Sequence, residues 1–539
     1  MKRSARGFAA ILILVSTLGG CGLSFGRQPA RDVAAEFDRL AHNVPAGVEF
    51  PLFFDLKPEG EVAERWNQLR SRLGADVSGE MLLNYVFGRP AGQNSMLGQF
   101  KVEALGLMDV IEGPAVTGWW NGAQYVILEV SSERDAREAL IRNLGDESAW
   151  ERKSFDGRTL YYGEFMESSG ETMHLAWTAA GGLAFLTYST SSVWFHKLEA
   201  LLSVPTSDTL AALPTWQVLH SRLPDRLIAA SGTVLGQGAA GPPPPSSGDD
   251  PLSALTYYLD AIMLAGVPED KGVRIYLDGT FAPGAADVPA FQPLFALPPV
   301  DAAAWTALPA DTALALASHD VATIWPWMRS TFNMQDLVDA FGAGLLDPLV
   351  APGGPLSGAF AAAITPPPPG QPVFSGVPAL QFLATSPDTA RLQADALEVA
   401  WQEAGGVLAD GLVEGIPIRR QVGLEISGYS PAYGFDGGTF YLGSSPEAIA
   451  GGLAAQRENR GLVTQHAYQV FLDALPDEPF YVAYLNGEPF LELVGANVPA
   501  DQDVDDSLYA MIGGLDGIGF GLALTPGRLD GVIYLVILE

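Results

Sequence analysis

Apolar residues along this chain recur with two kinds of spacing, one helical and one extended. Val62, Trp66, Leu69 and Leu73 follow one another at intervals of three or four residues, which predicts an amphipathic helix. Residues 133–144 and 387–401 also have a helical pattern, and each begins after serine, a residue suited to capping a helix. The apolar spacing therefore predicts helices at three separate places.

Runs rich in β-branched and aromatic residues predict strands between and after these helices. They cover residues 125–130, 183–187, 480–485, 519–525 and 532–538. Asn486-Gly487 and Pro526-Gly527 are turn pairs that follow two of the runs. Because strands outnumber helices, we expect α+β domains whose mixed or mainly antiparallel sheets carry helices on one face.

The chain also repeats itself. Residues 216–225 (WQVLHSRLPD) align without gaps on residues 468–477 (YQVFLDALPD), with five identities in ten positions. Four shorter blocks recur in the same order, at separations of 254 to 264 residues. They pair residues 44–46 with 308–310, 130–137 with 384–391, 185–189 with 441–445, and 275–277 with 533–535. One order with slightly drifting separations predicts two related domains with small loop changes.

The charge of the chain narrows the classes of function. Its 539 residues include 30 Lys plus Arg and 62 Asp plus Glu, a formal net charge of -32. Such acidity argues against nucleic-acid binding and against docking onto anionic lipid through a basic face. Residues 301–539 contain 7 cations and 28 anions, so most of the negative charge lies in the second repeat.

The first twenty residues have the layout of a secretory signal peptide. Lys2, Arg3 and Arg6 form a positive segment. The apolar stretch 8–18 that follows is shorter than the ~20 residues that a membrane-spanning helix needs. No later segment is long and apolar enough to span a membrane, so we expect an extracytoplasmic body without a transmembrane helix.

Leu18-Gly19-Gly20-Cys21 resembles the lipobox of bacterial lipoproteins, and Cys21 is the single cysteine of the chain. The resemblance implies removal of residues 1–20 and attachment of acyl chains such as palmitate to Cys21. Two or three acyl chains anchor a protein stably in a membrane. Gly22 follows in place of the aspartate that retains some lipoproteins at the inner membrane, which favours the outer membrane where the host has one.

These observations divide the chain into four parts. Residues 1–20 are the expected signal peptide and residues 21–42 a lipidated N-terminal tether. Residues 43–285 and 305–539 are the two expected α+β repeats. Residues 237–250 (QGAAGPPPPSSGDD) are expected to form an exposed loop, because such a segment cannot pack a core.

No catalytic constellation stands out among the six histidines, and the chain has no G-x-S-x-G, G-x-G-x-x-G or P-loop motif. His196 and Glu199 are spaced to share a helix face, but they have no third metal ligand nearby in sequence. His220 aligns with Leu472 in the repeat, which favours a structural role. We therefore expect no cofactor and lean away from an enzyme.

The most acidic cluster contains Asp501, Asp503 and Asp505, whose carboxylates are the hard oxygen ligands that Ca²⁺ prefers. The EF-hand pattern would place Gly and Glu where Asp506 and Ile512 stand. The cluster is therefore a weak calcium candidate, and a solvated acidic loop or a helix cap is the alternative.

Two tryptophan clusters, 119–120 and 325–327, are candidates for stacking on sugars or anchoring a partner, with core packing as the alternative. Adjacent residues of a strand face opposite sides of the sheet. At least one of Trp119 and Trp120 is therefore expected to be exposed.

Leu308-Pro309-Ala310-Asp311-Thr312 resembles the strand start of an uncharacterised bacterial envelope family, known as a domain of unknown function. The resemblance implies a duplicated α+β body behind a signal peptide or anchor, and it implies no catalytic residues. Residues 44–48 (VPAGV) depart from this pattern at their first, fourth and fifth positions.

The sequence therefore favours a lipid-anchored extracytoplasmic envelope protein with a non-catalytic binding or scaffold role. Its partners would be the membrane, through the lipid anchor, and an envelope protein, with no nucleic acid. Two alternatives stay open, a carboxylate-dependent extracytoplasmic hydrolase and a carrier of lipid or other apolar cargo. A cleft lined by carboxylates with raised pKa values would favour the hydrolase, and a long apolar cavity would favour the carrier.

Overall fold

A computed structural model describes residues 31–73, 107, 109–144, 150–166, 172–189, 194–234, 258–287, 292–302, 305–319, 358–366, 379–385, 390–403, 405–422, 430–497 and 513–538. The chain divides into two compact units. Unit 1 comprises Met1–Gln237 and Leu259–Thr280, and unit 2 comprises Gly238–Tyr258 and Phe281–Glu539.

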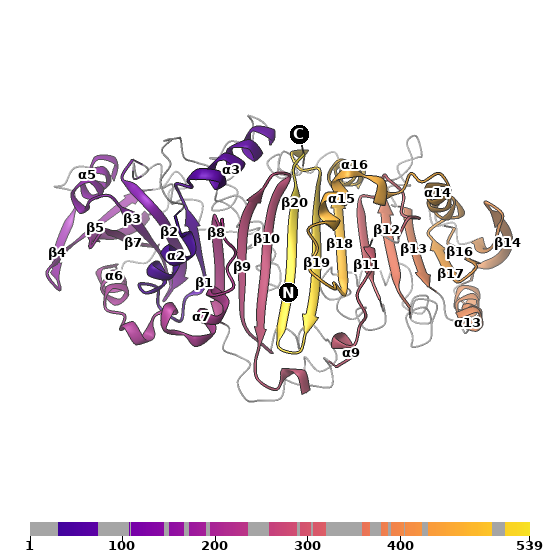
Figure 1. Cartoon of the computed structure of the whole chain (residues 1–539), viewed down its shortest axis with the longest axis horizontal. Helices are drawn as coiled ribbons and strands as arrows, with labels where there is room; N and C mark the ends of the chain where they lie inside the picture. Colours follow the sequence, from indigo (N-terminus) through magenta and orange to yellow (C-terminus); the bar gives the residue numbers. More distant parts are fainter. Residues whose placement is uncertain are drawn as a thin grey trace. The chain divides into compact units, whose positions relative to one another are not determined.

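Unit 1 is built on ten strands in the order β4-β5-β6-β7-β3-β2-β1-β8-β9-β10, and the pairings from β4 to β9 are antiparallel (Figure 1). Its helices are α2 (Val33–Ala41), α3 (Gly60–Arg72), α5 (Glu133–Leu144), α6 (Trp194–Leu202) and α7 (Pro214–His220). Its strands are β1 (Glu49–Asp55), β2 (Ile111–Trp120), β3 (Ala123–Val130), β4 (Glu151–Phe155), β5 (Arg158–Met166), β6 (Thr172–Ala180), β7 (Leu183–Ser189), β8 (Ala229–Val234), β9 (Leu259–Glu269) and β10 (Gly272–Phe281).

Unit 2 has ten strands in the antiparallel order β14-β15-β16-β17-β13-β12-β11-β18-β19-β20. Its helices are α9 (Gln292–Phe295), α13 (Ala390–Glu403), α14 (Pro446–Arg457), α15 (His466–Leu472) and α16 (Gly487–Asn497). Its strands are β11 (Leu314–Ser318), β12 (Phe360–Thr365), β13 (Ala379–Thr385), β14 (Val407–Val413), β15 (Ile416–Val422), β16 (Ala432–Asp436), β17 (Thr439–Gly443), β18 (Tyr481–Asn486), β19 (Gly517–Thr525) and β20 (Arg528–Val536).

The α+β class is confirmed, and the sheets are antiparallel at every pairing whose register is resolved. Adding ten to the number of each strand in unit 1 gives the strand order of unit 2. We call the end of each sheet that begins with β4 or β14 its outer end. The two β-hairpins there also match between the units, since each has a two-residue turn between paired strands. The duplication of one ancestral unit, with boundaries at residues 43–285 and 305–539, remains a prediction about how the chain arose.

The core of each unit lies between its sheet and a set of short helices. In unit 1 the ring of Phe53 on β1 lies 5.5 Å from that of Phe37 on α2 and 5.3 Å from that of Trp216 on α7. In unit 2 the ring of Tyr484 on β18 lies 4.9 Å from Tyr468 and 5.5 Å from Phe471, both on α15. Burying such aromatic side chains contributes most of the packing free energy in a core of this kind.

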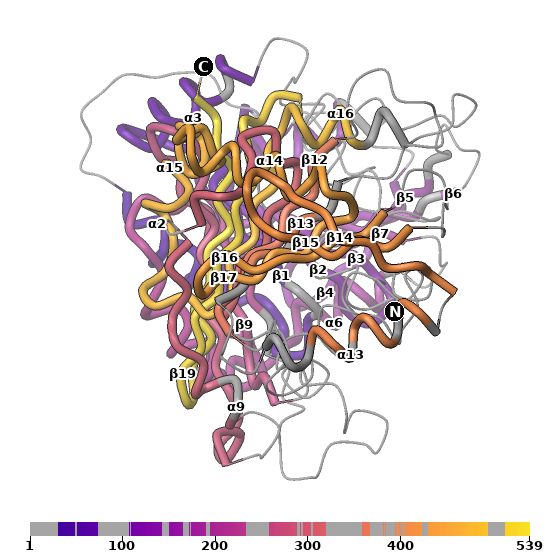
Figure 2. Tube along the Cα trace, turned by 90° about the vertical axis from the view of Figure 1, so that its right-hand side faces the viewer, coloured from indigo at the N-terminus to yellow at the C-terminus, as the bar shows by residue number. Residues whose placement is uncertain are grey.

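The outer helices cover both faces of each sheet, which differs from the expected single covered face. In unit 1, Arg137 of α5 lies over the ring of Tyr161, whereas Phe195 of α6 contacts the ring of Tyr162. Neighbouring strand residues face opposite sides, so α5 and α6 lie on opposite faces. Figure 2 shows the same arrangement for α13 and α14 of unit 2. The physical reason lies in β5, where the neighbouring residues Leu160 and Tyr161 are both buried, so each face of the strand has an apolar side chain for a helix to cover.

Several predicted elements are present where the pattern placed them. Residues 62–73 lie mainly in α3, residues 133–144 form α5, and Pro526-Gly527 joins β19 to β20. Gly487 is instead the first residue of α16, so Asn486-Gly487 ends a strand without making a hairpin. The loop 237–250 lies outside the described residues. Among the described helices, none has the length and apolar character needed to cross a membrane.

Candidate functional site

A cavity of about 470 Å³ opens at the outer end of unit 2, between α13 and strands β14 to β16. Throughout, it is called the outer cleft. Its size is within the range of natural ligand-binding pockets, roughly 300–1,000 Å³. It is lined by Ala394, Glu398, Asp410, Gly411, Pro417, Ile418, Arg419, Tyr433, Gly434 and Phe435.

The strand register brings the polar residues of the outer cleft into one row. Asp410 pairs with Arg419, and Arg419 pairs with Tyr433, across β14, β15 and β16. Residues paired across antiparallel strands project from the same face. The turn Glu414–Gly415 fixes this register, and both of its residues have positive φ (49° and 84°), as a type I′ turn requires.

Arg419 is held between two carboxylates. Its Nε lies 2.8 Å from Oε1 of Glu398 on α13, and its Nη2 lies 3.0 Å from Oε2 of the same residue. Its Nη1 lies 2.6 Å from Oδ1 of Asp410. The bidentate pair fixes the guanidinium geometry. The side chain of Asp410 is 86% exposed, so the remainder of its carboxylate faces solvent.

The hydroxyl of Tyr433 completes the cluster by donating a hydrogen bond to Oε1 of Glu398. Hydrogen bonds from Arg419, and then from Tyr433, lower the pKa of Glu398. Burial, and then the hydrogen bond to Glu398, raises the pKa of Tyr433. Glu398 is therefore an ionised acceptor and Tyr433 a neutral donor near neutral pH, and together with Asp410 and Arg419 they carry one net negative charge.

Exposed apolar side chains occur on two of the elements that form the outer cleft. Among the described residues, five large hydrophobic side chains are classed as exposed, and three of them lie in α13 and β14. These are Val399 at 51%, Val407 at 62% and Leu412 at 70%. Leu412 projects from the same face of β14 as Asp410 and so lies beside the outer cleft, whereas Val407 projects from the opposite face.

At the matching place in unit 1, aromatic rings pack against one another. Counting from the hairpin turns, Tyr161 and Trp177 occupy the positions of Arg419 and Tyr433. The two rings stack with centroids 4.2 Å apart, and Trp150 meets Trp177 edge-on at 6.0 Å. All three side chains are buried. Arg152, at the position of Asp410, lies over the ring of Tyr161.

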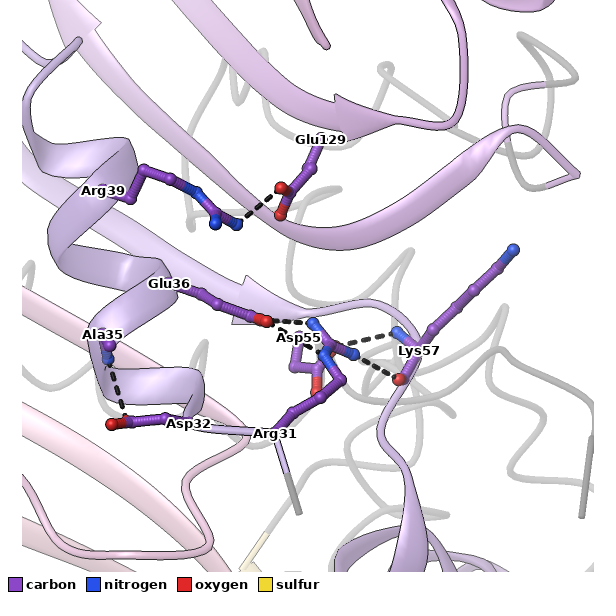
Figure 3. Close-up of polar contacts among 8 residues, drawn as sticks. All are labelled: Arg31, Asp32, Ala35, Glu36, Arg39, Asp55, Lys57 and Glu129. Atoms are coloured by element: carbon purple, nitrogen blue, oxygen red, sulfur yellow. Dashed lines mark hydrogen bonds and ion pairs between the residues drawn. The ribbon is translucent and has the colours of Figure 1, made fainter. Parts of the chain in front are cut away.

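A second polar cluster lies in unit 1 and joins Arg31, the first described residue, to α2 and to the end of β1 (Figure 3). The guanidinium of Arg31 contacts the carboxylates of Glu36 and Asp55, the latter at 3.4 Å, and donates to the backbone oxygen of Lys57 at 3.0 Å. Burial raises the pKa of Asp55 to about 6, and Arg31 opposes part of that rise. The guanidinium and both carboxylates are bound to one another, so we interpret the cluster as a structural contact between the start of α2 and the end of β1, and call it the clamp.

The sequence-predicted site residues are not brought together. Cys21, the lipidation candidate, and the calcium candidates Asp501, Asp503 and Asp505 lie outside the described residues, as do Trp325 and Trp327. In the described part of the chain, no group of three or more His, Cys, Asp or Glu side chains could hold a metal ion.

The other residues that the sequence singled out have structural surroundings. Nδ1 of His196 lies 3.6 Å from Glu199, but that carboxylate also binds Lys153 at 2.5 Å. Nε2 of His220 lies 2.7 Å from the backbone oxygen of Ala34, which holds α7 against α2. Trp119 is 37% exposed, as strand alternation predicted for one member of its pair.

The outer-cleft residues were missed by the sequence reasoning. Glu398, Asp410, Arg419 and Tyr433 form no recognised motif and span 36 positions of sequence. One signal was available: Arg419 is among only seven cations between residues 301 and 539, and it lies in a strand. A rare charge on a predicted strand is a reason to look for a partner.

Comparison with known proteins places no family on this chain. No protein-family model matches it, and no curated protein matches it. Crystal forms I, III and IV of TP0453, a bacterial envelope lipoprotein from Treponema, are similar over 44–45% of this chain and 79–80% of that one. The sequence identity is 14–15% and the TM-score 0.24–0.25, too low to support an argument about fold or function.

Proposed function

We propose that this protein is a lipid-anchored extracytoplasmic envelope protein that binds a partner at the outer cleft of unit 2 and does not transform it. The observation that carries the binding role is the contrast between the units. At the matching strand positions, Tyr161 and Trp177 of unit 1 stack on each other. Arg419 and Tyr433 of unit 2 are instead bonded to Glu398 and line a cavity beside the exposed Leu412.

The proposed anchor rests on the N-terminal sequence. A positive segment, a short apolar stretch and Leu18-Gly19-Gly20-Cys21 occur in the order of a lipoprotein signal. Acylated Cys21 would tether the body, and the absence of aspartate at Gly22 favours the outer membrane. The first docked residue, Arg31, comes ten residues after Cys21. The tether between them can span at most about 35 Å.

The chemistry of the outer cleft supports binding over hydrolysis. A glycoside-hydrolase pair needs one carboxylic acid with a raised pKa to protonate the leaving group. Here the hydrogen bonds from Arg419 lower the pKa of Glu398, and the same guanidinium also holds Asp410. The cavity is open and partly polar, unlike the enclosed apolar cavity that a lipid carrier needs.

Mass spectrometry of the N-terminal peptide from mature protein tests the anchor. We expect Cys21 as the first residue, carrying acyl chains that incorporate labelled palmitate and are lost in a Cys21→Ser variant. An unmodified Cys21 thiol in mature protein would contradict the anchor.

Site-specific photo-cross-linking in the native host tests the binding role. Benzoylphenylalanine in place of Leu412, at the rim of the outer cleft, should give a discrete adduct. The matched control has the same probe in place of Ser154, which precedes the equivalent turn of unit 1. Equal adduct patterns at both positions, or none at either, would contradict a partner at the outer cleft.

A further inference from the structure

We propose that β14 binds an extended polypeptide segment of a partner by strand addition, and that this segment carries a basic side chain between two apolar ones at alternate positions. This inference rests on the proposed binding role and specifies its ligand. It is built from four observations on β14: an open edge, the direction of its backbone groups, its exposed apolar side chains and its charge.

The edge of β14 is open in the part of the chain that the structure describes, because β14 pairs there with β15 alone. Figure 1 shows it as the last strand of the unit 2 sheet. An open edge presents unpaired N–H and C=O groups, which a strand from another molecule can pair with.

The hairpin turn determines which backbone groups of β14 face this edge. Val413 and Ile416 flank the two-residue turn, so they form a hydrogen-bonded pair. Such pairs alternate along an antiparallel ladder, which makes the pair of Leu412 and Pro417 non-hydrogen-bonded. Pro417 has no N–H to donate, in agreement with this assignment. The backbone groups that point outward therefore belong to Leu408, Asp410 and Leu412.

The side chains of the same three residues define the sequence that an added strand should have. By strand alternation, Leu408, Asp410 and Leu412 project from one face, the face of Arg419 and α13. A residue opposite Asp410 on an added strand would meet its exposed carboxylate, and residues two positions away would meet the two leucines. The matching segment therefore has five successive positions, with apolar residues at the first and fifth, a basic residue at the third, and any residue at the second and fourth.

The charge of the outer cleft favours a basic residue at the centre of that segment. Arg419 is the only cation among the lining residues, and two carboxylates already neutralise it. Asp395 on α13 adds a further exposed carboxylate near Tyr433. Complementary charge across an interface selects the partner and its register more than it adds affinity.

The equivalent edge in unit 1 is protected against such pairing. β4 carries Glu151, Arg152 and Lys153, and all three are exposed. Charged side chains on an edge strand discourage the docking of a further strand. β14 carries one charged residue in seven and exposes Val407 and Leu412. Only the unit 2 edge therefore has the features of a strand acceptor.

The test measures binding of a labelled seven-residue peptide to the mature full-length chain in detergent micelles, by fluorescence anisotropy. In the peptide, Val, Lys and Val occupy alternate positions between threonines. We expect one peptide per chain. Replacement of the peptide lysine by glutamate, or addition of salt, should weaken binding, because the ion pair with Asp410 is exposed.

Two matched proline variants locate the binding edge. Leu412→Pro removes an outward N–H and an apolar contact but leaves the hydrogen bonds between β14 and β15. It should lower the affinity for the peptide by about tenfold. Ser154→Pro makes the same change at the same position of β4 and should leave affinity unchanged. Asp410→Asn should weaken binding about two- to fivefold and remove its salt dependence. Circular dichroism establishes that each variant is folded.

Equal affinity of Leu412→Pro and wild type would overturn strand addition at β14, as would equal losses in the two proline variants. A concentration-dependent dimer that Leu412→Pro abolishes would also overturn it, because a second copy would then occupy the edge. A cross-link at position 412 with no peptide binding would refute strand addition alone. If there is neither a cross-link at position 412 nor peptide binding, the proposed binding role is refuted together with strand addition.

Discussion

The outer ends of the two sheets have the same strand register, but they differ in the side chains at one pair of matching positions. In unit 1, Trp150, Tyr161 and Trp177 fill the space beside α5 with buried rings. In unit 2, Arg419 and Tyr433 occupy the matching strand positions and leave a cavity of about 470 Å³ beside α13. Unit 2 keeps a buried ring at Tyr433, which lies 5.8 Å from that of Trp401, but it has a guanidinium where unit 1 has the ring of Tyr161.

The edge strands beside these two regions, β4 and β14, also differ in their exposed side chains. β4 exposes three charged side chains in five residues, whereas β14 exposes two large apolar side chains and a single carboxylate. One topology thus supports a closed, stabilising end in unit 1 and an open, ligand-accessible end in unit 2. The few side chains at the outer hairpins therefore distinguish the two ends, although the strand topology is shared.

The largest effect should come from opening the filled end of unit 1. Trp177→Ala removes a fully buried ring that stacks on Tyr161 at 4.2 Å, so we expect the free energy of unfolding to fall by about 3–5 kcal/mol. Chemical denaturation measures this loss. Hydrogen exchange should show it as faster opening of β5 and β6.

Trp119→Ala is the control for this change, because Trp119 belongs to the same unit and is 37% exposed. It should cost about 1 kcal/mol or less. Similar losses for the two tryptophans would show that the ring stack does not stabilise the outer end of unit 1, and the proposed difference between the units would fail.

The next effect concerns the clamp of unit 1, whose buried Asp55 is replaced by a histidine in unit 2. Phe54 pairs with the first residue of β8 and Ser318 with the first residue of β18, so the next residues, Asp55 and His319, occupy matching positions. Burial raises the pKa of Asp55 from 3.8 to about 6. The folded protein then binds more protons than the unfolded chain between these values, so the Asp55 contribution to stability is lost as pH rises through them.

Asp55→Asn has no carboxylate to ionise at this position and should remove that loss. The free energy of unfolding of the wild type, relative to the variant, should therefore fall by about 2 kcal/mol between pH 4 and pH 7. Urea denaturation across this range provides the measurement. If the difference in free energy of unfolding between the two proteins stays constant with pH, then burial does not raise the pKa of Asp55.

Much of the local structure could be predicted from the sequence. The helical spacing of residues 62–73, the serine before α5 and the Pro526-Gly527 turn each depend on neighbouring residues, and the structure has the expected element at each. Asn486-Gly487 was misinterpreted, because α16 begins directly after β18 and takes Gly487 as its first residue. Tertiary packing overrode a local turn preference there.

The outer cleft could not be predicted from the sequence for a different reason. Its chemistry depends on the register of β14, β15 and β16 and on which face α13 covers, and neither is determined by local spacing. Glu398 and Arg419 are 21 positions apart, yet they form a bidentate ion pair.

The smallest expected effect on stability belongs to that ion pair, and it separates the roles of the two outer ends. Glu398→Gln should cost about 1 kcal/mol or less, since the pair is partly solvated. It should nevertheless move the pKa of Tyr433 back toward its ordinary value, because Glu398 contributes to the rise after burial. Titration of carbon-labelled tyrosines by NMR measures this. Glu414→Gln, which removes the exposed pair with Arg457, is the control and should leave Tyr433 unchanged. An unshifted Tyr433 in Glu398→Gln would mean that the cleft is organised by packing, as in unit 1, and not by its charges.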